Sequence, residues 1–182
     1  TRLTAVEQAV DVAVERYDAT AAARAIVAFV DDDVANWYVR RSRDRFYDVS
    51  GDDNRAAFAT LHEVLTVTTR LLAPFAPFLS DWMHRALRED ESVHLASFTR
   101  PEPRPRDPAL QGAMGAIRQL AALGRAAREE AKLKVRQPLE RAVCVAPAVD
   151  MRLLEQLLPL LAAELNVKRV EFATSGDALV TL

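Results

Sequence analysis

Apolar residues recur at helical spacing along most of the chain, which predicts a mainly α-helical protein. The expected helices span residues 4–16, 21–46, 55–73, 77–87 and 109–132. Pro74 and Pro77 separate the third helix from the fourth, because helices tolerate proline mainly in their first turn. Together these segments predict an antiparallel helical bundle with one long, proline-rich connection over residues 97–108.

The longest expected helix carries an apolar stripe that predicts its packed face. This stripe consists of Ile26, Val27, Val30, Val34 and Trp37. Arg41 follows one turn after Trp37 and is expected at the rim of the core. Arg40 and Arg43 share the opposite face with Asn36. In the fourth helix, Phe75, Phe78 and Trp82 fall on one side and are expected in the core or in the seam between helices.

The pattern changes after Pro138. Residues 141–146 and 167–173 read as strands, and residues 149–165 read as a helix that Pro159 kinks or breaks. A turn at residues 175–177 lets the final residues pair back as a hairpin. We therefore predict a helical-bundle domain over residues 1–138 and the start of a small α/β unit over residues 139–182.

Composition narrows the class of protein. The 182 residues are 50% hydrophobic and carry a net charge of −2, so any contact with nucleic acid must come from a local patch. The chain has one cysteine, and no apolar run reaches the ~20 residues of a membrane helix. We expect a soluble, cytoplasmic protein, and the start of the chain within a pattern indicates a piece of a longer one.

Residues typical of catalysis do not form a recognisable group. His62, His84 and His94 are scattered, and only Cys144 accompanies them, so no spacing indicates a metal site. Neither a glycine-rich phosphate loop nor a nucleophile elbow is present. We therefore predict no catalytic residue, no metal and no cofactor in this chain.

Basic residues instead gather in two clusters. The first is NWYVRRSRDRF, residues 36–46, with four arginines and three aromatic residues. The second, residues 125–141, has six basic and three acidic residues, a net charge of +3. Arginine binds phosphate oxygens and stacks on exposed bases. A solvated surface and the helix dipole are alternative explanations for the arginines, and Trp37 and Tyr38 fit a core position better than a base platform.

The stretch DDDVANWYVRRSRDRFY closely resembles the anticodon-binding domain of isoleucyl-tRNA synthetases. The blocks SVHLASF, LGRAAREEAKLKVRQPL and AELNVKRVEF follow in that family's order and extend the resemblance over nearly the whole chain. Valyl and leucyl enzymes share the N-W-Y core, whereas R-R-S-R and K-V-R-Q-P-L point to the isoleucine family.

This resemblance implies a class I synthetase that attaches isoleucine to its tRNA with ATP and magnesium. The family's His-Ile-Gly-His-like and Lys-Met-Ser-Lys-Ser-like signatures are absent here. The chain therefore resembles a fragment without the catalytic and editing domains, inactive by itself. Its implied partners are isoleucine tRNA and the remaining domains of the parent synthetase.

By this resemblance, the basic clusters are expected to contact the anticodon stem and loop. The candidate RNA-binding residues are Asn36, Arg40, Arg41, Arg43, Arg45, Arg128, Lys132, Lys134 and Arg136. Trp37 and Tyr38 are expected in structural or stacking roles. Two alternatives stay open: a structural or protein-interaction bundle whose arginines pair with acids, and the equivalent domain of a valyl-tRNA synthetase.

Overall fold

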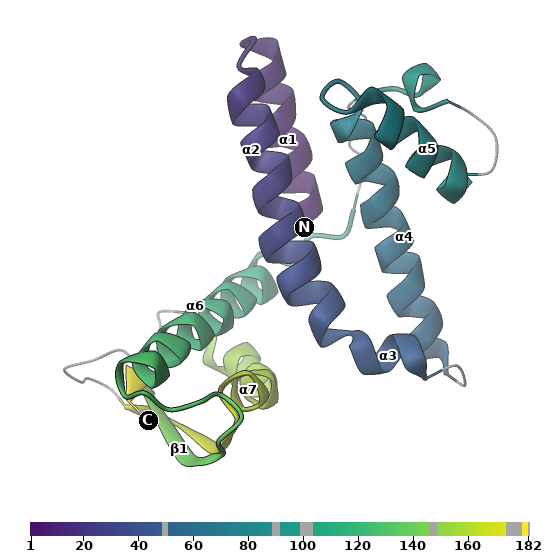
Figure 1. Cartoon of the computed structure of the whole chain (residues 1–182). Coiled ribbons are helices and arrows are strands. Elements are labelled where there is room, and N and C mark those ends of the chain that lie inside the picture. The colour runs from purple at the N-terminus through teal and green to yellow at the C-terminus, as the bar shows by residue number, and fades with distance from the viewer. Residues whose placement is uncertain (49–50, 89–91, 99–103, 146–148, 174–179, 182) are drawn as a thin grey trace. The chain divides into compact units, whose positions relative to one another are not determined.

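The computed structural model describes residues 1–48, 51–88, 92–98, 104–145, 149–173 and 180–181. The chain forms two compact units, Thr1–Pro105 and Arg106–Leu182. The first is helical, and the second combines two helices with a small sheet (Figure 1). The predicted mainly helical fold with a small C-terminal α/β unit is confirmed.

The first unit is built from two helical hairpins. In chain order its elements are α1 (Arg2–Glu15), α2 (Ala19–Ala28), the π-helix η1 (Phe29–Val39), α3 (Arg43–Tyr47), α4 (Asp52–Leu72), α5 (Pro77–Arg88) and the 3-10 helix η2 (Val93–Leu95). The Thr1 and Asp18 side chains cap α1 and α2 by accepting from backbone N–H groups. The core joins α1, α2, η1 and α4 through residues such as Val10, Ile26 and Leu71.

The prediction of one uninterrupted α-helix over residues 21–46 is wrong. The chain adopts π-helical geometry from Phe29 to Val39, and Ser42 interrupts it before α3 begins. Because a π-helix bonds residue i to i+5, positions spaced for an α-helix drift off a common face. Val27 lies before these turns, in α2. It is 59% exposed although the predicted stripe placed it in the core, whereas its neighbour Ile26 is 3% exposed.

The predicted packed face of α5 is also wrong. Phe78 is 91% exposed and Trp82 is 69% exposed, whereas Phe75 packs against the core. The buried residues of α5 are Ser80 and His84, and His84 Nδ1 lies 3.2 Å from the Thr69 hydroxyl of α4. The two helices therefore meet through small and polar side chains, and the large aromatic rings face away from this contact.

A buried ion cluster holds the connecting segment against the first unit. The Arg104 guanidinium donates to Glu7 of α1 and, over 2.6 Å, to Glu63 of α4. Glu7 also lies 3.8 Å from Arg70, and its side chain is 2% exposed. Sequence reasoning gave these residues no role. The rest of the predicted connection, residues 99–103, lies outside the described residues.

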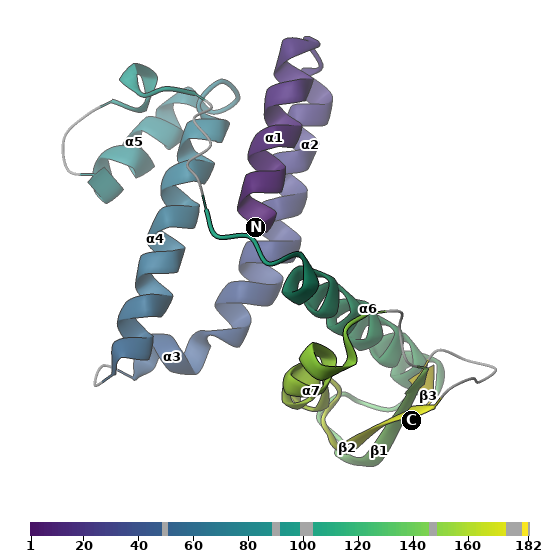
Figure 2. The same ribbon diagram turned by 180° about the vertical axis from the view of Figure 1, so that it is seen from behind.

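The second unit contains α6 (Pro108–Glu130), β1 (Leu139–Val145), α7 (Met151–Leu165), β2 (Val167–Ala173) and β3 (Val180–Thr181). Helices α6 and α7 pack on each other and on the sheet (Figure 2). Gly124 of α6 permits this packing, since a Cβ there would meet Leu165 side-chain atoms at 2.5 Å. The predicted domain boundary follows residue 138, but the compact units divide between residues 105 and 106, because α6 packs against α7.

The sheet has the order β2-β1-β3, with β1 parallel to β2 and antiparallel to β3. The last strand was predicted to pair with β2 as a hairpin, and that pairing is wrong: Val180 aligns with Cys144 of β1. Ala142 and Cys144 are fully buried, and their spacing of two residues places both on one face of the sheet. Helix α7 runs through Pro159 without a break. The predicted turn at residues 175–177 lies outside the described residues.

Cys144 provides a chemical probe of this unit. Burial raises the pKa of its thiol to about 11. We expect the native chain to resist a thiol reagent at pH 7.5 and to react fully in urea, as measured by absorbance. Because the folded pKa lies above the ordinary value, this group favours folding below about pH 8.5, and that contribution is lost as the pH rises towards 11. Rapid labelling of the native chain would contradict the buried position.

Among the described residues, no helix is both long and apolar enough to cross a membrane.

Candidate RNA-binding surface

The first basic cluster lies where the chain leaves η1 and turns through α3 towards α4 (Figure 1). The turn is fixed from α4: the Asn54 side-chain amide donates to the backbone oxygens of Arg45 and Phe46, at 2.8 and 3.1 Å. These bonds satisfy carbonyl groups at the end of α3, where a helix leaves its last acceptors unpaired. We call this turn, from the end of η1 through α3 to the start of α4, the first corner. Its arginines therefore project from a fixed backbone.

Arg41 and Trp37 contact each other. The guanidinium carbon of Arg41 lies 5.8 Å from the centre of the Trp37 ring, within range of a cation–π interaction. Both side chains are half-buried. Arg41 therefore lies at the rim of the core, the position that the sequence predicted for it, and its contact with Trp37 helps to hold the end of the long helix.

Arg45 is engaged within the corner. Its Nε and Nη2 atoms donate to the two carboxylate oxygens of Asp53, at 2.8 and 2.7 Å. This bidentate hydrogen bonding raises the pKa of Arg45 and lowers the pKa of Asp53. The ion pair ties α3 to the first turn of α4, so Arg45 is better assigned to shaping the surface than to contacting RNA.

Tyr38 also has a structural role. Its hydroxyl donates to the Ala57 carbonyl of α4 over 2.9 Å. Its ring meets Phe46 edge-on, with centroids 6.3 Å apart, and Phe46 in turn contacts Phe58 at 5.0 Å. These three rings form the apolar support beneath α3.

Three of the candidate residues in this cluster are exposed: Asn36, Arg40 and Arg43. The Arg40 Nε atom donates to the Asn36 carbonyl over 2.9 Å, so its side chain lies back along its own helix. The side chain of Arg43, on α3, makes no hydrogen bond or ion pair with any residue that the structure describes. Arg43 is consequently the cation of this corner most available to an external anion.

The second cluster lies in the second unit, in the loop that follows α6. Lys132, Lys134 and Arg136 are exposed there. Backbone bonds shape the loop, including Leu133 N to Arg128 O at 2.8 Å and Gln137 N to Lys134 O at 2.9 Å. Lys132 adopts a positive φ of 56° where the helix ends. The loop therefore presents three cations from a defined backbone.

Arg128 does not belong to that exposed set, which corrects its assignment as an RNA contact. It is fully buried, and its guanidinium donates to the carbonyls of Leu165 (2.7 Å), Asn166 (3.2 Å) and Lys134 (3.0 Å). A charged donor that satisfies several buried carbonyls has a structural role. Arg128 joins the end of α7 to the loop that carries the three exposed cations.

Known proteins resemble the chain over nearly all of its length. A family model described as the anticodon-binding domain of tRNA ligase matches residues 1–143. This chain belongs to that family. The matched region includes the first basic cluster and the loop of the second, and it extends past the predicted boundary at residue 138.

Three relatives of the chain carry the same name. The isoleucine–tRNA ligase of Thermobifida fusca is 48% identical over 166 residues, which cover 89% of this chain and 16% of the relative. The enzyme of Chlamydia trachomatis serovar L2 is 44% identical over 91% of the chain, and that of Chlamydia abortus is 40% identical over 90%. The chain spans 16% of the length of each. The predicted resemblance to isoleucyl-tRNA synthetases is confirmed.

Two of the sequence blocks that carry the family resemblance are far apart in the chain but contact each other in the fold. The Asn166 side chain, from the block AELNVKRVEF, donates to the Val135 carbonyl over 3.0 Å. Arg128, from the block LGRAAREEAKLKVRQPL, reaches the backbone beside Asn166. Asn166 itself has left-handed φ and ψ angles at the end of α7, which asparagine tolerates well. The two blocks thus fix one loop together.

Sequence reasoning missed two exposed residues at the first corner of the domain. Tyr47, the last residue of α3, is 74% exposed. Arg55 is exposed and directly follows Asn54, which binds α3. The only sequence signal for them was their position beside the arginine-rich stretch, since neither belongs to an apolar stripe that could be tested for burial.

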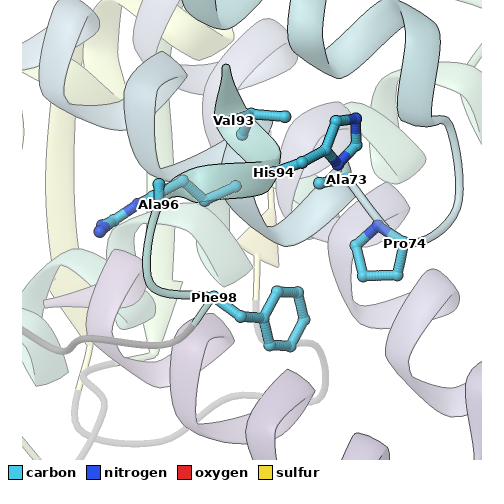
Figure 3. A pocket seen from close by; sticks show the side chains of 7 residues that line it. Ala73, Pro74, Val93, His94, Ala96 and Phe98 are labelled. Atoms are coloured by element: carbon cyan, nitrogen blue, oxygen red, sulfur yellow. The ribbon is translucent and has the colours of Figure 1, made fainter. Parts of the chain in front are cut away.

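A cavity of about 240 Å³ lies elsewhere in the first unit, between the end of α4 and η2 (Figure 3). Its lining residues are Arg70, Ala73, Pro74, Val93, His94, Ala96 and Phe98. The cavity adjoins the end of α4 opposite to the turn at α3, so it is separate from the basic corner. No group of side chains suited to hold a metal ion occurs in the described part of the chain.

Proposed function

We propose that this chain binds the anticodon stem and loop of isoleucine tRNA as part of an isoleucine–tRNA ligase. The observation that carries this proposal is the family match over residues 1–143, since its description names anticodon binding. The names of the relatives support isoleucine as the amino acid. The exposed cations at the first corner and in the loop after α6 supply the chemistry that RNA phosphates require.

The candidate residues divide into two groups under this proposal. Asn36, Arg40 and Arg43 at the first corner, with Lys132, Lys134 and Arg136 in the loop, are the proposed RNA contacts. Trp37, Tyr38, Arg41, Arg45 and Arg128 position them. The net charge of the chain can stay near zero because only part of the surface needs to meet RNA.

Amino-acid attachment is proposed to depend on other parts of the parent enzyme. That enzyme would use ATP and magnesium, and it would act in the cytoplasm. The chain lacks the family's catalytic signature sequences, so it is expected to show no aminoacylation by itself. We propose that the RNA-binding part of the enzyme includes both the predicted domain of residues 1–138 and the α/β unit that follows it.

The test is binding of the 182-residue chain to tRNA transcripts that carry an isoleucine or a valine anticodon, at several salt concentrations. We expect tighter binding to the isoleucine anticodon and a steep decrease of affinity with salt. Preference for the valine anticodon would favour the equivalent domain of a valyl enzyme. Absence of binding at low salt would contradict the proposal and favour a protein-interaction bundle.

Arg43→Ala is expected to weaken tRNA binding about tenfold, the effect of one charge-assisted hydrogen bond. The slope of log affinity against log salt should decrease by about one, because one phosphate contact is lost. The measurement is a salt series by fluorescence anisotropy. Arg16→Ala is the matched control, since Arg16 is exposed at the α1–α2 turn, far from α3 in the same unit (Figure 1). Equal slopes for wild type and Arg43→Ala would exclude this contact.

A further inference from the structure

Tyr47 is an aromatic side chain that the core of the first unit does not use. It is 74% exposed, whereas the neighbouring rings of Tyr38 and Phe46 are half-buried and contact each other. Tyr47 ends α3, and Phe46 beside it faces the α4 ring of Phe58. An exposed ring on a supported backbone loses little rotational freedom when a flat ligand stacks on it, because a tyrosine side chain has only two rotatable angles.

The backbone under this ring is held from α4. Asn54 donates to the carbonyls of Arg45 and Phe46, the two residues directly before Tyr47. The Arg45–Asp53 ion pair adds a second connection between α3 and α4. The ring therefore occupies a defined place before any ligand arrives, which lowers the entropic cost of binding.

The charges around Tyr47 favour a nucleobase as the ligand of this surface over a phosphate group alone. Arg43 lies four residues earlier in α3, so its side chain and the ring of Tyr47 share one face. Asp44 and Asp48 are exposed on the same short segment and offset the positive charge. A base stacks on the accessible face of an aromatic ring, and a cation beside the ring can hold the adjoining phosphate.

We propose that Tyr47 stacks on an unpaired base of the anticodon loop while Arg43 holds the phosphate next to that base. This inference rests on the proposed function and names the ring that contacts the loop. The aromatic residues of the basic stretch, Trp37, Tyr38 and Phe46, support the surface, and Tyr47, which directly follows the stretch, stacks on the RNA.

The experiment compares Tyr47→Ala, Tyr47→Phe and wild type in binding to an isoleucine anticodon stem-loop RNA. Tyr17→Ala is the matched control, because Tyr17 is 97% exposed at the far end of the same unit. A set of stem-loops, each with one loop base removed, locates the partner base. Tryptophan fluorescence verifies the fold of each variant, since Trp37 and Trp82 both lie in this unit.

We expect Tyr47→Ala to lose between about fivefold and about 150-fold in affinity, with an unchanged salt slope. Tyr47→Phe and Tyr17→Ala should bind like wild type. One stem-loop of the set lacks the base that stacks on Tyr47. Tyr47→Ala and wild type should bind this stem-loop with equal affinity.

Two results would overturn the inference while tRNA binding itself persists: equal affinity of Tyr47→Ala and wild type, or an equal loss on every stem-loop of the set. If the wild-type chain binds neither the stem-loop nor the complete transcript, the proposed function fails, and the inference fails with it.

Discussion

Replacement of Arg128 by methionine is expected to destabilise the second unit by about 3 kcal/mol, because buried carbonyl groups lose their donor. The guanidinium satisfies backbone oxygens of Leu165, Asn166 and Lys134, and methionine fills similar space without a hydrogen bond. Labelling of the buried Cys144 thiol measures the effect. Labelling through transient unfolding should accelerate about 100-fold at pH 7.5.

Two comparisons make this prediction specific. Arg136→Met, in the exposed part of the same loop, should change the labelling rate little, since surface substitutions usually cost under about 0.5 kcal/mol. The tryptophan fluorescence transition should keep its midpoint in Arg128→Met, because both tryptophans lie in the first unit. An unchanged labelling rate in Arg128→Met would show that the buried guanidinium does not hold α7 to the loop.

Glu7→Ala is expected to destabilise the first unit by about 3–5 kcal/mol, since it removes the buried carboxylate that faces both Arg104 and Arg70. The Glu7 side chain is 2% exposed and the Arg104 side chain is 7% exposed, so water cannot replace the lost carboxylate easily. Urea unfolding followed by tryptophan fluorescence measures the change. The Cys144 labelling rate should stay the same, because that thiol belongs to the second unit.

Glu63→Ala is the control that tests whether the burial of the carboxylate determines the loss of stability. Glu63 also binds Arg104, but its side chain is 50% exposed, and exposed pairs contribute only about 0–1 kcal/mol. A loss in Glu7→Ala no larger than that in Glu63→Ala would contradict the importance of burial. In that case Arg104 would not be what fastens the connecting segment to α1 and α4.

The helices were predictable where the signal was local. Pro77 begins α5, as expected from the preference of proline for the first turn, and Pro108 likewise begins α6 behind the Asp107 cap. The strand over residues 167–173 was predicted with its observed bounds. In each case the residues that determine the boundary are neighbours in the sequence.

The faces of the helices were less predictable. In α5, either side of the helix could have packed against its neighbours. The side with Ser80 and His84 is buried, and His84 contacts Thr69 of α4, whereas Phe78 and Trp82 are exposed. In α2, Val27 is 59% exposed although it directly follows the buried Ile26 and belonged to the predicted stripe. The 100° spacing identifies a candidate face, but it assumes α-helical geometry and a partner of matching shape.

The sequence by itself determined the helical composition, the presence of two basic clusters and the resemblance to anticodon-binding domains. These depend on residue types and on spacings of a few positions. The tertiary structure decided which basic side chains remain at the surface. Arg43 and Arg128 are the same residue type, yet one is exposed and the other is fully buried against carbonyls 37 and 38 residues away. Burial depends on such distant contacts, and no local pattern encodes them.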